Sequence, residues 1–285
     1  MRHECYFCHV RTVENLIDKF KPDDNTAEDF VFAVNHLLGE NRDLENPYLA
    51  TLIHRLAKRM INHDDPYLDE KFQANEILLG QYGRWKSFVH SSADSLHAAA
   101  KLAVAGNIID YGAHSAPRDI HQEISDIVER DFKIDESELL YSAIQDADSI
   151  LYLGDNAGEI VFDRLFIEEM QHPNVTFVVR GKPVINDVTL EDAKQVEMEE
   201  VSKVISNGYD APSTLPEYCS DEFYQTFTGA DLIISKGQGN YEGLMNHHEH
   251  PVFFMLMAKC NPIARLLGVN KGDLVIKKME KCPGN

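Results

Sequence analysis

The sequence predicts an α/β protein with a Rossmann-like open, mostly parallel sheet flanked by helices, and with an all-helical N-terminal region. Apolar residues recur at helical spacing through the first half of the chain. In the second half, short apolar runs alternate with helix-like stretches, which is the order that produces parallel βαβ units. We therefore expect a helical region over residues 1–146 and a Rossmann-like domain over residues 147–285.

Four segments of the first half carry their apolar residues on one helical face. In the first of them, Phe30 and Val34 are spaced by about one helical turn. Asn25 or Thr26 is suited to cap its start, and Gly39 is suited to end it. The four expected helices cover residues 25–39, 47–62, 92–106 and 119–132.

Four apolar runs of the second half are too short for helices and are expected to be strands. They are residues 149–153 (SILYL), 175–179 (VTFVV), 231–235 (DLIIS) and 252–257 (VFFMLM). The helix-like stretches that follow them cover residues 159–170, 190–200, 221–227 and 262–267.

The composition excludes several classes of protein. A formal net charge of −20 repels nucleic-acid phosphates and anionic lipid surfaces. No apolar run is long enough to cross a bilayer, and the charged N-terminus lacks the apolar core of a signal peptide. We therefore expect a cytoplasmic protein that binds neither nucleic acid nor membranes.

The five cysteines do not form the even set of a disulfide framework. Cys5 and Cys8 form a C-x-x-C pair, but a zinc site needs two further ligands. Cys260 or a histidine is a candidate to complete such a site, and the alternative is that both cysteines pack as small apolar side chains.

Polar motifs follow three of the expected strands, at the point where each strand ends. The motifs are residues 154–159 (GDNAGE), 180–187 (RGKPVIND) and 236–242 (KGQGNYE). Ligands of open parallel sheets bind beyond the carboxyl ends of the strands, so the three motifs are expected to converge there.

The side chains in these motifs suit a metal ion and a phosphate group. Asp155, Asn156 and Asp187 offer carboxylate and amide oxygens, which are hard ligands for ions such as Mg²⁺ and Mn²⁺. Arg180 and Lys236 offer positive charge. The glycines of residues 236–242 allow backbone N–H groups to approach a ligand. Turn or cap chemistry explains each residue alone, but their joint placement indicates a site for phosphoryl transfer.

Other cofactor motifs fit less well. The chain has no P-loop signature, no G-x-G-x-x-G after the first strand and no G-x-S-x-G elbow. Two alternatives stay open. One is a carboxyl methyltransferase that uses S-adenosylmethionine, although the loop over residues 154–159 is poor in glycine. The other is a non-catalytic protein that binds a metal or a phosphorylated metabolite.

Six ordered segments resemble one known family, the damage-control phosphatases of domain-of-unknown-function family 89, in its stand-alone microbial branch. The segments are ECYFCH at the N-terminus, AGNIIDYG (105–112), YLGDNAGE (152–159), RGKPVINDVT (180–189), KGQGNYEGL (236–244) and AKCNPIA (258–264). The resemblance implies a helical region that caps a Rossmann-like domain and one divalent ion (Mn²⁺, Co²⁺, Ni²⁺ or Mg²⁺) between them. It also implies that Lys236 contacts a substrate phosphate.

The resulting expectation is a phosphatase that hydrolyses small phosphorylated metabolites such as sugar phosphates, nucleotides or damaged phospho-metabolites. A metal-activated water is the favoured nucleophile, oriented by Glu159 or Asp110. An aspartyl-phosphate on Asp155 is less favoured, because Ala157 stands where a second carboxylate is required. The expected metal ligands are Asp155, Asn156 and Asp187, the expected catalytic residues are Asp155, Glu159 and Lys236, and the expected substrate-binding residues are Asn107, Asp110, Arg180, Gly237 and Asn240.

Overall fold

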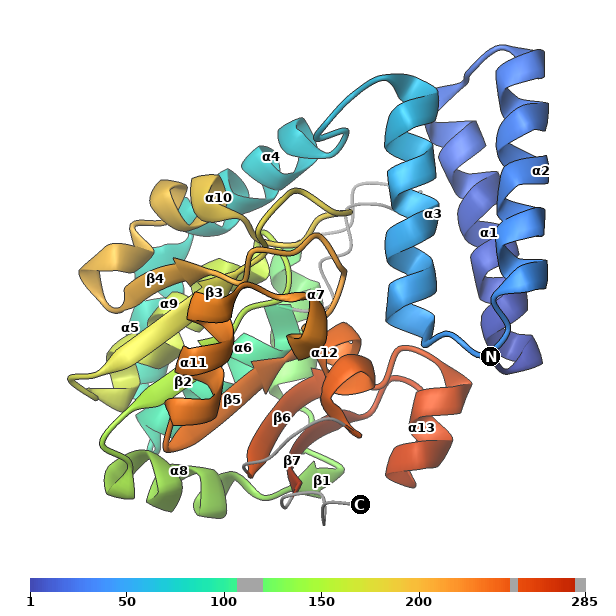
Figure 1. The fold of residues 1–285 in the computed structure, drawn as a ribbon. Coiled ribbons are helices and arrows are strands. Elements are labelled where there is room, and N and C mark those ends of the chain that lie inside the picture. Colours follow the sequence, from blue (N-terminus) through green and yellow to red (C-terminus); the bar gives the residue numbers. More distant parts are fainter. Residues whose placement is uncertain (107–119, 247–250, 280–285) are drawn as a thin grey trace.

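A seven-stranded, mostly parallel sheet forms the centre of the computed structural model, which describes residues 1–106, 120–246 and 251–279 (Figure 1). The strand order is β1-β7-β6-β5-β2-β3-β4, and only the β6–β7 pair is antiparallel. The strands are β1 (Ile134–Asp135), β2 (Ile150–Leu153), β3 (Val175–Val179), β4 (Lys203–Ser206), β5 (Leu232–Lys236), β6 (Val252–Met257) and β7 (Leu274–Met279).

Helices cover both faces of the sheet. The larger core lies on one face, against α4 (Leu68–Leu79), α5 (Tyr82–Ser91), α6 (Ser95–Ala105), α7 (Ile120–Val128), α8 (Ser137–Asp146), α9 (Glu159–Met170) and α10 (Leu190–Gln195). The second core lies on the other face, against α11 (Asp221–Gly229), α12 (Gly237–Leu244) and α13 (Asn261–Leu267). Two 3₁₀ turns, Met198–Glu200 and Pro216–Tyr218, lie in the connections.

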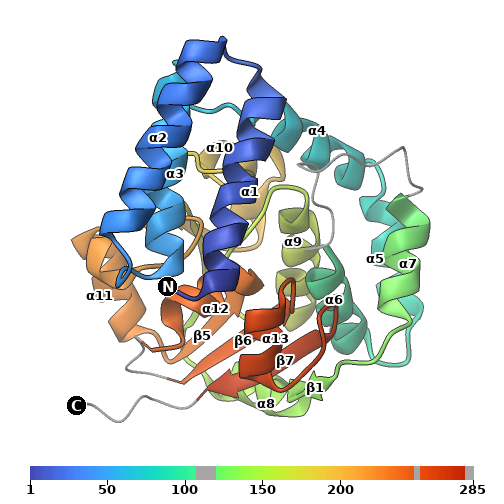
Figure 2. The same cartoon turned by 90° about the vertical axis from the view of Figure 1, so that its right-hand side faces the viewer.

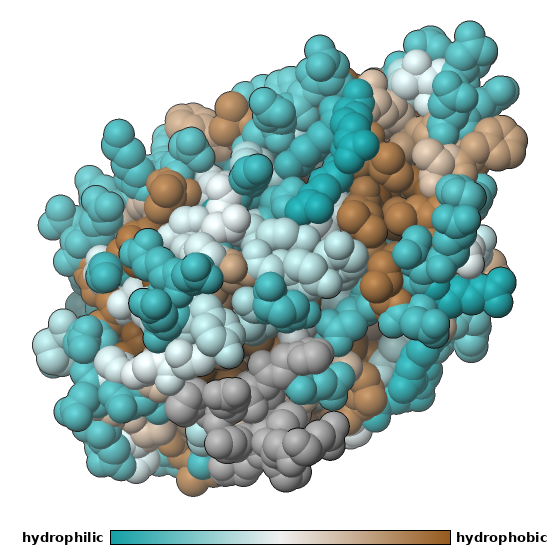
Figure 3. Space-filling view, in the orientation of Figure 1, coloured by the Kyte–Doolittle hydropathy of each residue, from teal (hydrophilic) through white to brown (hydrophobic). Residues whose placement is uncertain are grey.

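The first three helices form a separate group with an apolar core of its own. They are α1 (His3–Phe20), α2 (Asp24–Glu40) and α3 (Asn46–Ile61). Figure 2 shows them side by side at one end of the molecule, and their core contains Leu16, Val34 and Ile53. The face shown in Figure 3 is largely hydrophilic, in keeping with the net charge of −20, and apolar side chains gather on it near α3. None of the described helices combines the length and the apolar composition needed to cross a bilayer.

The expected α/β architecture is confirmed. The four expected strands are β2, β3, β5 and β6, and α2, α3, α6 and α9 lie where the apolar periodicity placed helices. Three strands, β1, β4 and β7, were not anticipated, and neither were the helices α1, α4, α5, α8 and α12. β1 lies inside the region expected to be all-helical, because two residues are too few to show an alternating pattern. β7 ends in a lysine-rich run, and α12 begins in a glycine-rich segment that is typical of a loop.

The order of the strands has a switch point between β2 and β5. From β2 the chain passes through α9 to β3 on one side, and from β5 it passes through α12 to β6 on the other side. The two connections also lie on opposite faces of the sheet. Chains that diverge in this way leave a crevice at the carboxyl ends of the two strands, where ligands of doubly wound sheets bind.

Phe177 tests the larger core. Its ring is fully buried in β3 and stacks on Tyr152 with 5.5 Å between the ring centroids. We expect Phe177→Ala to lower the free energy of unfolding by about 3–5 kcal/mol, because the substitution leaves a cavity. Phe32→Ala is the control, since Phe32 is 71% exposed and should change stability by less than about 0.5 kcal/mol. Denaturation with urea measures both, and equal effects would contradict the described core.

Candidate functional site

A short backbone pairing joins the first two motifs. The Val188 N–H donates to the carbonyl of Asp155 over 2.9 Å, and Asn156 forms an antiparallel bridge with Asp187. The Ala157 N–H donates to the Asn186 carbonyl over 2.9 Å. This pairing places the side chains that follow β2 and β3 next to one another.

Gly154 lets the chain pass close to the core as it leaves β2. A Cβ at this position would lie 2.6 Å from the Phe177 ring. The backbone of Gly154 therefore packs directly on this ring, and Asp155 is the next residue along the chain. The position of Asp155 therefore depends on the absence of a side chain at Gly154, the residue before it.

Two buried carboxylates share one guanidinium group. Asp155 is 6% exposed, Asp187 is 3% exposed and Arg180 is 2% exposed. Arg180 Nε donates to Asp187 Oδ2 over 2.7 Å, and its Nη2 lies 3.7 Å from Asp155 Oδ1. Nη2 makes no hydrogen bond within the described part of the chain, whereas Nη1 donates to Thr214 Oγ1 over 3.3 Å.

The site has more negative than positive charge. Burial raises the pKa of Asp187 to about 7; Arg180 opposes this effect, and the neighbouring Asp155 adds to it. The residues therefore fit a hard divalent cation, which would supply the missing positive charge. No three His, Cys, Asp or Glu side chains gather for a metal among residues 1–106, 120–246 and 251–279, and the Asn156 amide is the oxygen-bearing side chain that directly follows Asp155 in sequence.

Asn156 contacts two carboxylates through its amide nitrogen. Its Nδ2 donates to Asp155 Oδ2 over 2.8 Å and to Glu159 Oε2 over 3.2 Å. Both hydrogens of the amide are used in these bonds, which leaves Oδ1 as the atom available to a cation.

Lys236 lies behind Glu159 in the interior. The side chain has no exposed surface, and its Nζ donates to Glu159 Oε1 over 2.6 Å, Asp163 Oδ1 over 2.5 Å and the Ala103 carbonyl over 2.8 Å. An ammonium group has three N–H donors, so all of them are used.

Gly237 and Asn240 fix the start of α12 against the motif after β2. Gly237 has φ of +78°, and a Cβ there would lie 1.8 Å from Asp155 Oδ2. Asn240 is buried, and its Nδ2 donates to the carbonyls of Gly154 and Lys236 over 3.1 and 2.8 Å. Its Oδ1 accepts from Thr214 Oγ1 over 2.9 Å. The side chain of Asn240 therefore joins the start of α12 to the ends of β2 and β5 and to the segment that contains Thr214.

The structure brings eight of the ten expected site residues into one connected cluster. They are Asp155, Asn156, Glu159, Arg180, Asp187, Lys236, Gly237 and Asn240. The other two, Asn107 and Asp110, lie outside the described residues.

Two residues beside the cluster were missed from the sequence. Asp163 contacts Lys236, and Asn75 of α4 accepts from the Gly158 N–H over 2.6 Å and donates to Asp192 over 3.0 Å. A signal for Asp163 was present, because it is a single acid four residues after Glu159 in an otherwise apolar stretch of α9. Asn75 carries no such signal, since its role depends on the packing of α4 against α9.

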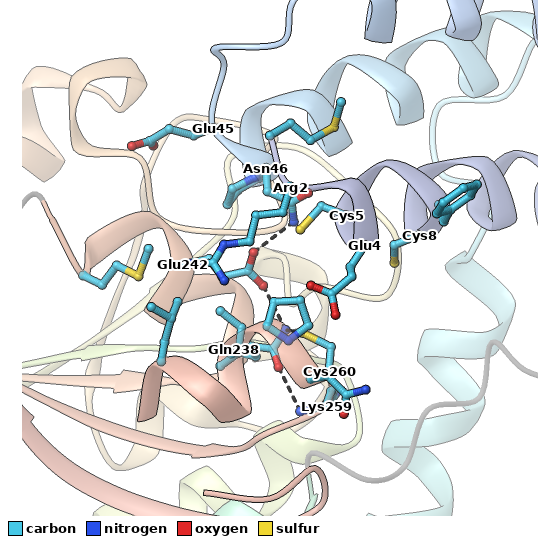
Figure 4. A pocket seen from close by; sticks show the side chains of 18 of the residues that line it. Arg2, Glu4, Cys5, Cys8, Glu45, Asn46, Gln238, Glu242, Lys259 and Cys260 are labelled. Atoms are coloured by element: carbon cyan, nitrogen blue, oxygen red, sulfur yellow. Dashed lines mark hydrogen bonds between the residues drawn. The ribbon is translucent and has the colours of Figure 1, made fainter. Parts of the chain in front are cut away.

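A separate cavity of about 800 Å³ lies where α1 meets α12 and the segment before α13 (Figure 4). Cys5, Cys8 and Cys260 line it, and Cys260 Sγ accepts from Gln238 Nε2 over 3.4 Å. The described cysteines are all free, and those three do not form a group able to hold a metal ion as they stand. The three cysteines lie around one cavity at the junction of the helical group and the sheet, as Figure 4 shows.

Comparison with known proteins shows the family to which the chain is related. The model of the damage-control phosphatase ARMT1-like domain matches residues 1–275. An uncharacterized protein of Methanocaldococcus jannaschii is 36% identical over 98% of this chain and 95% of its own length. The damage-control phosphatase of Pyrococcus horikoshii is 32% identical over 96% of each chain, and that of Archaeoglobus fulgidus is 36% identical over 82% of this chain and 83% of its own.

A solved structure shows the same architecture. The crystal structure of a DUF89 family protein from Pyrococcus horikoshii superposes with a TM-score of 0.87 over 99% of each chain, at 30% identity. With the family model covering nearly the whole sequence and relatives above 30% identity, the chain belongs to the damage-control phosphatase ARMT1-like family, DUF89.

Proposed function

We propose that this protein is a metal-dependent phosphatase that hydrolyses small phosphorylated metabolites. One observation carries the proposal: two buried carboxylates from separate strand ends, with an oriented amide between them, share a single guanidinium group. Two relatives that bear the name damage-control phosphatase support the reaction class. Sugar phosphates, nucleotides and damaged phospho-metabolites are the proposed substrates.

In this proposal Asp155, Asn156 and Asp187 hold the divalent ion, which is Mn²⁺, Co²⁺, Ni²⁺ or Mg²⁺. When bound, such an ion supplies Lewis-acid chemistry that neutralises charge on a phosphoryl group and acidifies a water molecule. The chain contributes the pre-formed arrangement of the three oxygen donors and the removal of bulk water from around them.

Positive groups of the chain bind the phosphoryl oxygens. Arg180 Nη2 is directed toward Asp155 and has hydrogens to donate. α12 begins at Gly237, in contact with the Asp155 carboxylate, and the first N–H groups of a helix favour a bound anion. Lys236 adds the field of its buried charge through Glu159.

Glu159 is the described carboxylate proposed to orient the attacking water, and Asp110 is the alternative outside the described residues. A covalent route through Asp155 is the second mechanism. Trapping a phosphorylated peptide that contains Asp155 would favour the covalent route, as would retention of configuration at a chiral phosphorus, whereas inversion would favour direct attack by water.

A panel of phosphorylated sugars, nucleotides and cofactors, assayed for phosphate release with each metal and with EDTA, tests the proposal. The names of the relatives do not favour the methyltransferase alternative. Tight binding of metal and phosphometabolite without any phosphate release would instead support a non-catalytic binding protein.

Removal of the Asp155 carboxylate should abolish both metal binding and phosphate release. We expect Asp155→Ala to lose Mn²⁺ binding and to lower metal-dependent phosphate release by more than about 100-fold, because a metal ligand matters at least as much as its supporting contacts. Calorimetry and a phosphate assay measure the two effects, and circular dichroism checks the fold.

Asp148→Ala is the matched control, because exposed Asp148 lies just before β2 while Asp155 lies just after it. Asp148→Ala should keep both Mn²⁺ binding and metal-dependent phosphate release. Full metal-dependent activity in Asp155→Ala would show that the site is placed wrongly.

Gly237→Ala tests the close approach of α12 to the metal ligands. The added methyl group would overlap Asp155 Oδ2, and φ of +78° disfavours a side chain as well. We expect Mn²⁺ affinity to fall about tenfold or more, since a small misplacement of a ligating group is costly. Gly229→Ala is the control, because a side chain at Gly229 would meet no atom within 4 Å. Equal Mn²⁺ affinity of the two variants would count against contact between α12 and Asp155.

A further inference from the structure

The ammonium group of Lys236 is fully used by protein acceptors. Its three donors reach Glu159, Asp163 and the Ala103 carbonyl at 2.5–2.8 Å, and the side chain has no exposed surface. A phosphate could therefore bind Lys236 only if one of these acceptors let go. The geometry gives Lys236 a role toward its neighbours before any role toward a substrate.

Asp163 holds Lys236 from the interior side. Its Oδ1 accepts from Lys236 and also from the Tyr152 hydroxyl over 2.7 Å. Lys236, Glu159 and Asp163 come from β5 and α9, and all three are fully buried. A buried ion pair contributes little net stability, because the loss of hydration offsets the attraction, so the arrangement is better explained by the geometry that it fixes.

That geometry extends to the proposed metal ligands. Lys236 bonds one oxygen of Glu159, and the other oxygen accepts from Asn156, whose amide also donates to Asp155. A chain of hydrogen bonds thus runs from Asp163 through Lys236, Glu159 and Asn156. Each link sets the orientation of the next.

We propose that Asp163 and Lys236 are positioning residues for the reaction: Asp163 anchors Lys236, and Lys236 fixes the Glu159 carboxylate so that the Asn156 amide presents its oxygen to the metal site. This inference rests on the proposed function. It replaces the expectation of a direct contact between Lys236 and the substrate phosphate with an indirect role.

The ionisation of Asp163 gives a second way to follow this cluster. Burial raises the pKa of Asp163 to about 7, Lys236 opposes the rise, and Glu159 on the same helix adds to it. Among the described residues of the other elements packed against Asp163, the titratable groups that bond to it are Lys236 of β5 and Tyr152 of β2. Because the folded pKa lies above the ordinary value of 3.8, ionisation of Asp163 lowers stability progressively as the pH rises from about 4 to about 7.

Asp163→Asn tests the proposal. The substitution keeps the oxygen that accepts from Lys236 and Tyr152 but removes the charge that anchors Lys236. We expect the dissociation constant for Mn²⁺, measured by calorimetry, to rise about 10-fold to 100-fold, as for other contacts that support metal ligands. The kcat for a phosphomonoester should fall, while KM should change little because no substrate contact is lost.

A pH series adds a readout independent of catalysis. The melting temperature of Asp163→Asn relative to the natural protein, both free of metal, should rise from about pH 4 to about pH 7 and then level off, because the variant has no acid to ionise at this position. Glu168→Gln is the matched control on the same helix. Glu168 forms an ion pair of 2.6 Å with Lys86 and takes no part in the cluster. The control should leave the Mn²⁺ dissociation constant unchanged.

Lys236→Met is best made in the Asp163→Asn background, where fewer buried charges are left without a partner. If Lys236 is a positioning residue, this double variant binds Mn²⁺ still more weakly. Natural affinity for Mn²⁺ in both variants, with a raised KM in the double variant alone, would overturn the inference and restore direct phosphate contact. Absence of both Mn²⁺ binding and phosphate release in the natural protein would instead overturn the proposed function, and this inference with it.

Discussion

The pairing of two loops at the edge of the sheet is the constraint on which the site depends. The hydrogen bond from the Val188 N–H to the Asp155 carbonyl, together with the bridge between Asn156 and Asp187, locks the loop after β2 to the segment after β3. Neither loop alone could hold its carboxylate in a buried position. Without the other loop, the acid would be either exposed to water or buried against apolar side chains with no polar partner. Once paired, the loops bury both acids beside Arg180.

The buried charges form two layers. The outer layer consists of Asp155, Asp187 and Arg180 and carries an excess of negative charge. The inner layer consists of Glu159, Lys236 and Asp163. Asn156 connects the layers through a single amide. Electrostatic interactions are strong away from water, so each buried charge in this arrangement restricts the orientation of its neighbours.

The helical group contributes to the site through α3. Lys58 donates to the Pro183 carbonyl in the loop after β3, and Arg55 pairs with Asp210 in the loop after β4. Tyr48 of the same helix stacks on Tyr218 with 4.7 Å between the ring centroids. The group therefore braces the loops that extend from the carboxyl ends of the strands, which explains why a unit with its own apolar core stays docked against the sheet.

The sequence alone determined the fold class and the strands β2, β3, β5 and β6, because the alternation of short apolar runs with helices is compatible with few arrangements. It also determined that the three polar motifs cluster, because parallel strands end at a common edge of the sheet. It did not determine β1, β4, β7 or α12. Their residues show no clear strand or helix pattern, and packing against neighbouring elements sets their conformation. The tertiary structure also decided what surrounds Lys236. Its contacts with Asp163 and Ala103 join residues that are 73 and 133 positions apart, and local residue patterns carry no information about such a meeting. The sequence therefore indicated which side chains gather at the site, while packing decided which of them face the crevice and which support it from behind.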